Sequence, residues 1–188
     1  MDYFMYYLKR NSIQLFFLVL VLFFNNAQSN DKLIKISNIK LDYEASNYWV
    51  SYDQHIPLSP DTLNAISKGI PLYFKVSVNI FENSYGFNKI KLSNKMYTKL
   101  KYKSLLRTYV ITDINGKKSY FENVDDALKK ISHVDNLKIG QTSKMESGML
   151  EIEIKLDKKY LPKALQINAN SASWDLSSEV VKYNIGIL

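Results

Sequence analysis

The residues best suited to acid–base or metal chemistry are His55 and His133, the only two imidazoles in the sequence. Neither has another ligand at metal-motif spacing, so we expect no metal site and no cofactor. Histidines far apart in sequence can still meet a Ser and an Asp in the fold, but no Gly-x-Ser-x-Gly elbow supports such a triad. We therefore interpret both as surface or strand-end histidines and predict no catalytic residue.

Paired carboxylates give no stronger signal. Asp125 and Asp126 begin an expected helix, where adjacent side chains point about 100° apart and the helix dipole explains both acids. Glu151 and Glu153 alternate with apolar residues on an expected strand, so they face outward and do not indicate a glycosidase cleft.

Positive charge is concentrated between Lys89 and Arg107, and no acidic residue falls between Glu82 and Asp113. Alternation in this stretch turns Met96, Thr98, Leu100 and Tyr102 inward and the lysines outward. The candidate binding residues are Lys95, Tyr97, Lys99, Lys101, Lys103 and Arg107. Outward lysines also keep an edge strand from pairing with a neighbour, and this simpler interpretation stays open.

Three tyrosines, Tyr73, Tyr97 and Tyr109, would share a face with these lysines. Such a mixture binds glycans or peptides through stacking and charge. Tyrosine is also a good strand former that tolerates half-burial, so this pattern alone does not assign a function.

The N-terminal segment resembles a signal peptide. Lys9 and Arg10 precede a ten-residue apolar run, Leu15–Phe24, and Ala27-Gln28-Ser29 follows it with small residues at the cleavage positions. A transmembrane helix needs roughly 20 apolar residues. We predict a signal peptide over residues 1–29 and one domain over residues 30–188, which leaves 188 − 29 = 159 residues outside the cytoplasm. An uncleaved anchor is the alternative.

The remaining composition excludes several classes of function. The sequence contains no cysteine, so disulfides, thiolate metal sites and cysteine nucleophiles are ruled out. The formal net charge of +7 favours an anionic partner, and export makes nucleic acid an unexpected one. An anionic membrane surface or an acidic protein fits better.

A succession of short alternating segments predicts a mainly β fold. The strongest is Gly69–Phe81, where Leu72, Phe74, Val76, Val78 and Ile80 share one face. Three further strands are expected at Leu33–Tyr43, which has a bulge at Ser37-Asn38, at Tyr48–Ile56 and at Met149–Leu156. A hairpin is expected from Arg107–Ile114 and Lys117–Phe121, joined by a type I′ turn at Asn115-Gly116. The last strand has Val181, Tyr183, Ile185 and Ile187 on one face.

Two short helices are expected between these strands. Ser59-Pro60-Asp61 begins the first, Gly69 ends it, and Leu63, Ile66 and Ile70 form its apolar side. Asn123 caps the second, Val124–Ile131. We predict an antiparallel β-sandwich-like domain with two short helices; the alternative is an α+β fold with one curved antiparallel sheet and both helices on one face.

Four sequence blocks, in this order and spacing, resemble a known family. The blocks are Gly69–Phe74, Leu105–Tyr109, Phe121–Leu128, and Leu161-Pro162 through Gln166–Asn168 to Trp174–Ser178. The chain resembles the proteobacterial exported proteins of domain of unknown function 4390, over roughly Asp42 to Tyr183. The resemblance implies a periplasmic protein of the Gram-negative cell envelope, associated with a neighbouring membrane sensor kinase of the nitrogen-regulation type. It supplies no catalytic residues.

These observations lead to two functional hypotheses. The first is a non-enzymatic periplasmic binding or accessory domain that contacts an inner-membrane protein, such as a sensor kinase, or the anionic envelope surface. The second is an envelope hydrolase with an unrecognised active site, which requires a histidine within hydrogen-bonding reach of a partner in a pocket. The sequence does not indicate an oligomeric state.

Overall fold

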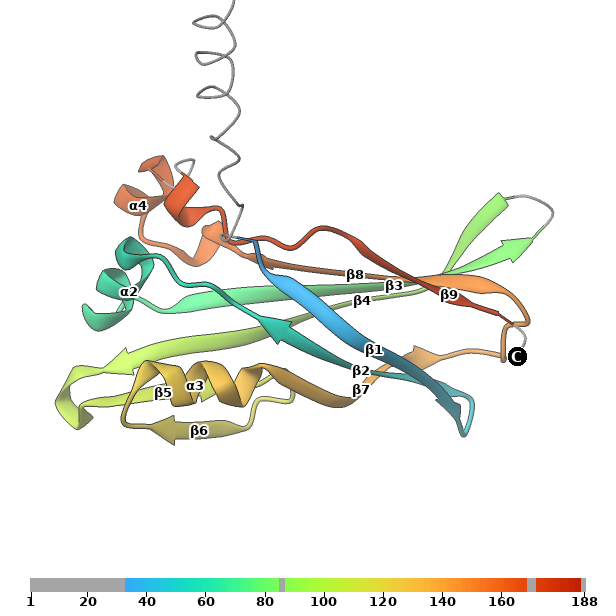
Figure 1. Ribbon diagram of the computed structural model, residues 1–188, viewed down its shortest axis with the longest axis horizontal. Coiled ribbons are helices and arrows are strands. Elements are labelled where there is room, and N and C mark those ends of the chain that lie inside the picture. The colour runs from blue at the N-terminus through green and yellow to red at the C-terminus, as the bar shows by residue number, and fades with distance from the viewer. Residues whose placement is uncertain (1–32, 85–86, 169–171, 187–188) are drawn as a thin grey trace, which may run out of the picture. The chain divides into compact units, whose positions relative to one another are not determined.

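Two antiparallel sheets form the described part of the chain (Figure 1). The computed structural model describes residues 33–84, 87–168 and 172–186, all within one unit, residues 32–188. The segment predicted as a signal peptide lies outside the described residues. No helix among the described residues is long and apolar enough to span a bilayer.

The smaller sheet, sheet A, has the order β1-β2-β7, and the larger, sheet B, has the order β6-β5-β4-β3-β8-β9. In sheet A the strands are β1 (Lys35–Glu44), β2 (Asn47–His55) and β7 (His133–Gln141). In sheet B they are β6 (Lys118–Phe121), β5 (Thr108–Thr112), β4 (Phe87–Lys103), β3 (Leu72–Ser84), β8 (Gly148–Leu156) and β9 (Val181–Ile185). The prediction of a mainly β, two-sheet domain is confirmed.

The core lies between the two sheets. The inward-facing residues of β3 and β8 make up most of the part contributed by sheet B. Leu72, Phe74, Val76, Val78 and Ile80 are each at most 1% exposed, as the period-two pattern predicts. From β8 come Leu150, Ile152, Ile154 and Leu156, and from sheet A come Tyr48, Val50, Tyr52, Leu137 and Ile139. Burial of these side chains is the main stabilising contribution to the fold.

Short helices lie toward one end of the sandwich (Figure 1). Helix α2 (Pro60–Ser67) begins where the Ser59 side chain accepts a hydrogen bond from the Thr62 backbone N–H, and Gly69, at φ +83°, follows its end. Helix α3 (Val124–Ile131) begins at the Asn123 cap and buries Ala127 and Ile131. A third helix, α4 (Lys163–Asn168), was not predicted. Single 3₁₀ turns are η1 (Ser104–Leu106), η2 (Lys158–Tyr160) and η3 (Ala172–Trp174).

The structure corrects three local predictions. Leu63 is 37% exposed, because Thr62, Ala65 and Ile66 form the buried side of α2. The connection between β5 and β6 is the longer loop 113–117, in which the Asp113 carboxylate accepts hydrogen bonds from two backbone N–H groups and only Gly116 has positive φ. The third strand of sheet A, β7, was not predicted. By contrast, the bulge predicted in β1 is present, and Asn38 has φ +53° there.

Candidate functional site

The predicted basic strand, β4, pairs along its length with β3, and this pairing places two sets of polar side chains on one outward face. Tyr73 lies opposite Lys99, Lys75 opposite Tyr97, and Ser77 opposite Lys95. Side chains directly opposite each other in an antiparallel pair are about 5 Å apart at Cβ, so they form a continuous surface. We call this surface the Lys-Tyr face; it comprises Tyr73, Lys75, Lys95, Tyr97, Lys99, Lys101 and Lys103.

No lysine of the Lys-Tyr face forms an ion pair with an acidic side chain of the described residues. The ion pairs recorded among the described residues lie elsewhere, on Lys91, Lys155, Lys158 and Lys182. Two of the lysines of the face instead lie over aromatic rings: the Lys99 ammonium is 5.1 Å from the centre of the Tyr73 ring, and the Lys103 ammonium is 5.6 Å from that of Tyr120. These cations remain available to an anionic ligand.

A cluster of three tyrosine rings gives the face a rigid apolar part. Tyr160, from η2, stacks on Tyr73 at 4.3 Å between ring centres and meets Tyr97 edge-on at 5.7 Å. The Tyr97 hydroxyl donates a hydrogen bond of 3.3 Å to the Asp157 carboxylate. Partial desolvation and then the neighbouring Asp157 charge raise the pKa of Tyr97, so its hydroxyl stays protonated and donating at neutral pH.

The acidic residues of sheet B lie beside this face and are paired. Glu153 binds Lys155 at 2.8 Å on the same strand, and Glu151 lies 3.5 Å from Lys182 on β9. The strand that carries these glutamates, β8, pairs with β3, where Glu153 faces Ser77 and Glu151 faces Asn79. The outward side of sheet B is therefore charge-balanced over β8 and β9 and positive over the Lys95–Lys103 part of β4.

Most of the residues predicted from sequence come together. Lys95, Tyr97, Lys99, Lys101 and Lys103 all lie on the Lys-Tyr face. Arg107 lies beyond it, in the turn after η1, with φ +49° and its side chain exposed.

The expected position of Tyr109 was wrong, because Tyr109 lies opposite Tyr102 and packs against it on the inward face. Lys75 was not among the candidate binding residues, and Asp157 and Tyr160 were missed. Lys75 alternates with core residues of β3 and could have been found once β3 was paired with β4. Asp157 and Tyr160 follow β8, so no sequence spacing indicates their approach.

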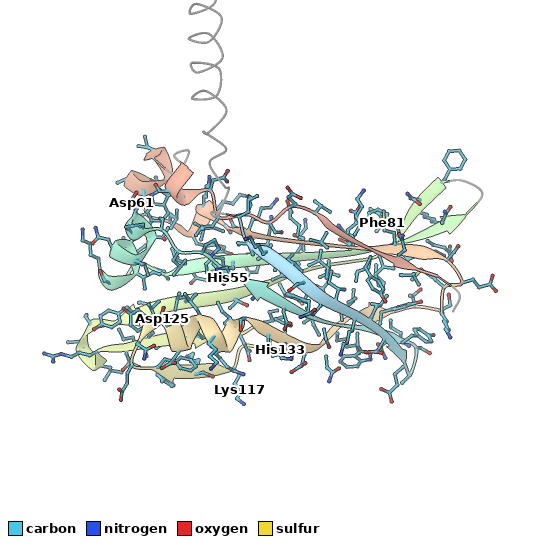
Figure 2. All side chains as sticks on the ribbon, in the orientation of Figure 1. His55, Asp61, Phe81, Lys117, Asp125 and His133 are labelled. Atoms are coloured by element: carbon cyan, nitrogen blue, oxygen red, sulfur yellow. The ribbon has the colours of Figure 1, made fainter. Side chains whose placement is uncertain are left out.

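A second polar cluster joins β2 to β7 around His133 (Figure 2). The His133 Nδ1 contacts the Asp53 carboxylate, and its Nε2 lies 2.8 Å from the Asp135 carboxylate. These two carboxylates raise the pKa of His133, the Asp53 hydrogen bond contributing most. Hydrogen bonds from Asn38 and His133 lower the pKa of Asp53. The arrangement favours a doubly protonated imidazolium between two carboxylates.

A cavity of about 190 Å³ lies beside this histidine. Its lining includes Gln54, Thr98, Ser119 and Lys130 as well as His133. A triad histidine needs one ring nitrogen on its carboxylate and the other on the nucleophile, whereas both nitrogens of His133 face carboxylates. The cavity therefore adjoins a structural ion pair, and the hydrolase hypothesis remains a prediction from the sequence. His55 is exposed at the end of β2.

Within the described ranges, no group of three or more His, Asp or Glu side chains has a metal-binding arrangement. The fold and the site together define a two-sheet, mainly β domain with a positively charged, tyrosine-bearing sheet face. Residues 31–184 match the family described as "Domain of unknown function (DUF4390)", and the chain belongs to that family. No curated protein and no solved structure matches the chain.

Proposed function

We propose that this protein is an exported, non-enzymatic accessory domain of the cell envelope that binds an anionic partner through the Lys-Tyr face. The partner is an inner-membrane protein with an acidic surface or the anionic membrane surface itself. Export is supported by the signal-like sequence of residues 1–29. The uncleaved form would hold the same domain next to the inner membrane.

The observation that carries this proposal is the unneutralised row of lysines on a flat, outward sheet face. Solvated lysines are common on exposed strands, where they prevent edge pairing. That explanation does not fit Lys99, Lys101 and Lys103, because there β4 pairs with β3 on one side and with β5 on the other. Lys95 lies on the part of β4 that pairs with β3 but not with β5. From Lys99 to Lys103, β4 has no free edge to protect, so edge protection does not explain these three lysines.

The tyrosines make the surface suited to a folded partner or a headgroup layer. The rings of Tyr73, Tyr97 and Tyr160 are held by one another and by the Asp157 hydrogen bond. Rigid rings lose little conformational entropy on binding, and tyrosine offers both apolar area and a polar hydroxyl.

Charge reversal tests the proposal. We expect the quadruple variant Lys95→Glu, Lys99→Glu, Lys101→Glu, Lys103→Glu to lose co-purification with its envelope partner and to lose binding to anionic vesicles at low salt. A matched control reverses four exposed lysines elsewhere, Lys40, Lys68, Lys117 and Lys129, and changes the net charge equally. Unchanged binding of the first variant, or equal loss in the control, would contradict a role for this face.

A further inference from the structure

Two consecutive leucines, Leu105 and Leu106, are exposed in the turn that joins the end of β4 to the start of β5. Leu105 is 99% exposed and Leu106 is 62% exposed. A single exposed leucine is ordinary on a protein surface. Two in succession at the tip of a turn form an apolar point that nothing in the described part of the chain covers.

The turn is built to hold these leucines outward. Ser104–Leu106 forms the 3₁₀ turn η1, Arg107 follows in the left-handed conformation, and its backbone N–H donates to the Ser104 carbonyl at 3.2 Å. The Thr108 hydroxyl donates to the Leu106 carbonyl at 2.7 Å. The positive φ of Arg107 is unfavourable by about 1 kcal/mol or more for a residue other than glycine. The two hydrogen bonds offset this strain, and the resulting turn holds the leucine side chains in water.

Basic side chains surround this apolar tip. Lys103 immediately precedes the turn and Arg107 ends it. Lys101 lies two residues before Lys103, on the same face of β4. Tyr120 lies beside Lys103 and is 55% exposed. Apolar side chains flanked by Lys, Arg and Tyr are typical of segments that enter the interface of an anionic bilayer.

A comparison within the same strand shows that this end differs from the other. Phe87, at the opposite end of β4, is 79% exposed, but there Glu82 lies opposite Lys89 and binds Lys91 at 2.7 Å. At the Phe87 end Glu82 thus offsets part of the positive charge, whereas no ion pair is found on Lys101, Lys103 or Arg107 among the described residues at the Leu105 end. With a rise of about 3.3 Å per residue, the two ends are roughly 50 Å apart, so a domain that docks by one end keeps the other end away from the bilayer.

We propose that the β4–β5 turn inserts Leu105 and Leu106 into the headgroup region of an anionic bilayer, while Lys101, Lys103 and Arg107 bind lipid phosphates. This inference rests on the proposed function, in which the anionic membrane surface is one partner. It adds the orientation of the domain relative to the membrane. The domain docks by one end of sheet B. Lys95, roughly 30 Å along β4 from the tip, then lies beyond the Debye length of about 8 Å and contributes little.

Site-specific labelling tests this orientation, because the sequence contains no cysteine and each introduced thiol is unique. A nitroxide is attached to the full-length chain at Leu105→Cys, at Leu106→Cys or, as the matched control, at Phe87→Cys. The chain is incubated with vesicles of phosphatidylcholine alone or with added phosphatidylglycerol. We expect the labels at positions 105 and 106 to become shielded from a water-soluble relaxation agent only on anionic vesicles, and the label at position 87 to stay accessible.

Charge variants of the labelled chain show whether phosphates drive insertion. Each of Lys103→Gln and Arg107→Gln is expected to shift the equilibrium between inserted and exposed label by about fivefold, which corresponds to about 1 kcal/mol per cation near an anionic surface. Lys95→Gln is expected to leave it unchanged. Equal effects of Lys95→Gln and Lys103→Gln would show docking by the flat face and overturn the end-on orientation.

The outcomes separate this inference from the proposed function. If the quadruple lysine reversal abolishes partner or vesicle binding while the labels at positions 105 and 106 remain as accessible as the label at position 87, insertion is wrong and the proposed function stands. If the chain forms dimers without vesicles and the labels at positions 105 and 106 are shielded in those dimers, a second copy of the chain covers the tip. That result overturns the membrane assignment. If labels and lysine variants both show no effect, both proposals fail.

Discussion

His133 is fixed between Asp53 on the neighbouring strand and Asp135 on its own strand, which makes the β2–β7 pairing sensitive to pH. The pKa of His133 is raised, so its stabilising contribution is complete below about pH 6.5 and is lost as pH rises through the folded-state pKa. The pKa of Asp53 is lowered, so its contribution is present above pH 3.8 and is lost as pH falls through its folded-state pKa.

We therefore expect His133→Asn to reduce the free energy of unfolding more at pH 5.5 than at pH 9, as measured by urea denaturation at both values, and the difference to be small because solvent screens an exposed pair. The His133 titration can be followed by NMR in a His55→Gln background, where it is the only imidazole. An equal effect at both pH values would show that the ion pair contributes nothing. Asn38→Ala is a useful companion, because it removes the other hydrogen bond to Asp53 without touching the histidine.

Gly148 is a single residue on which the register of sheet B depends. A Cβ at this position would lie 2.3 Å from the backbone carbonyl oxygen of Phe81, which is closer than any real Cβ contact. Gly148 opens β8 and lies between Glu82 of β3 and Ile185 of β9. We expect Gly148→Ala to lower the free energy of unfolding by about 1–3 kcal/mol through forced displacement of β3.

Thermal or urea unfolding measures this effect, and Gly186→Ala is the matched control, because its Cβ would meet no atom within 4 Å. Similar losses in both variants would mean that glycine's chain entropy, and not the close approach to Phe81, is responsible.

Among the elements, α2 has a capping residue that also bonds to a distant part of the chain. The Ser59 hydroxyl oxygen accepts from the Thr62 N–H at 3.3 Å and its hydroxyl donates to the Ser173 carbonyl at 2.9 Å, linking the helix start to η3. We expect Ser59→Ala to lower the free energy of unfolding by about 1–2 kcal/mol. Ser67→Ala, in the same helix, alters an exposed hydroxyl bound only to Asn64 and is expected to be near neutral in the same unfolding measurement. Equal losses in the two variants would contradict the capping role.

The elements that could be predicted from sequence are those with an uninterrupted period. β3, β8 and the outward residues of β4 alternate without a break, and the structure keeps each on the expected face. β7 was missed because its apolar residues Val134 and Leu137 are out of phase across Asn136, which has φ +48°. A bulge of this kind disrupts the period on which strand prediction depends.

The candidate site was only half predictable for a related physical reason. Alternation assigns a residue to a face of its own strand, but strand order depends on contacts distant in sequence. The approach of Lys75 to Tyr97, and of Tyr160 to both Tyr73 and Tyr97, follows from pairings that no local pattern specifies. Tyr109 was placed on the wrong face because β5 begins at Thr108, after Arg107 has already turned the chain.

At the scale of the whole molecule, a formal charge of +7 would by itself cause weak, non-specific attraction to any anionic surface. The proposed binding differs from this non-specific attraction because it depends on where the charges lie. Glutamates neutralise lysines over β8 and β9 and at Lys91, whereas Lys95, Lys99, Lys101 and Lys103 of β4 form no ion pair with a described acidic residue, so positive charge is concentrated over this part of sheet B. Binding should therefore depend on which lysines are removed and not only on how many.

This difference gives a prediction for the intact protein. At low salt, the variant Lys95→Gln, Lys99→Gln, Lys101→Gln, Lys103→Gln is expected to bind its anionic partner on the order of 10²–10³ times more weakly than the parent, at about 1 kcal/mol per lysine for a partner that contacts the whole Lys-Tyr face. Replacing Lys40, Lys68, Lys117 and Lys129 by Gln should have little effect. End-on docking at a bilayer would reduce the expected loss to that of the lysines near the tip, Lys101 and Lys103, or about 30-fold.

Salt dependence provides the check, because exposed charges are screened as the Debye length falls from about 10 Å at 0.1 M to about 3 Å at 1 M. Binding measured by vesicle sedimentation or partner capture should weaken steeply with salt in the parent and in the control variant, and only slightly in the Lys-Tyr face variant. The parent and the face variant should bind equally at 1 M salt. A parent whose binding does not change with salt would show that its affinity comes from apolar contacts, and the lysines of β4 would then be solvated surface.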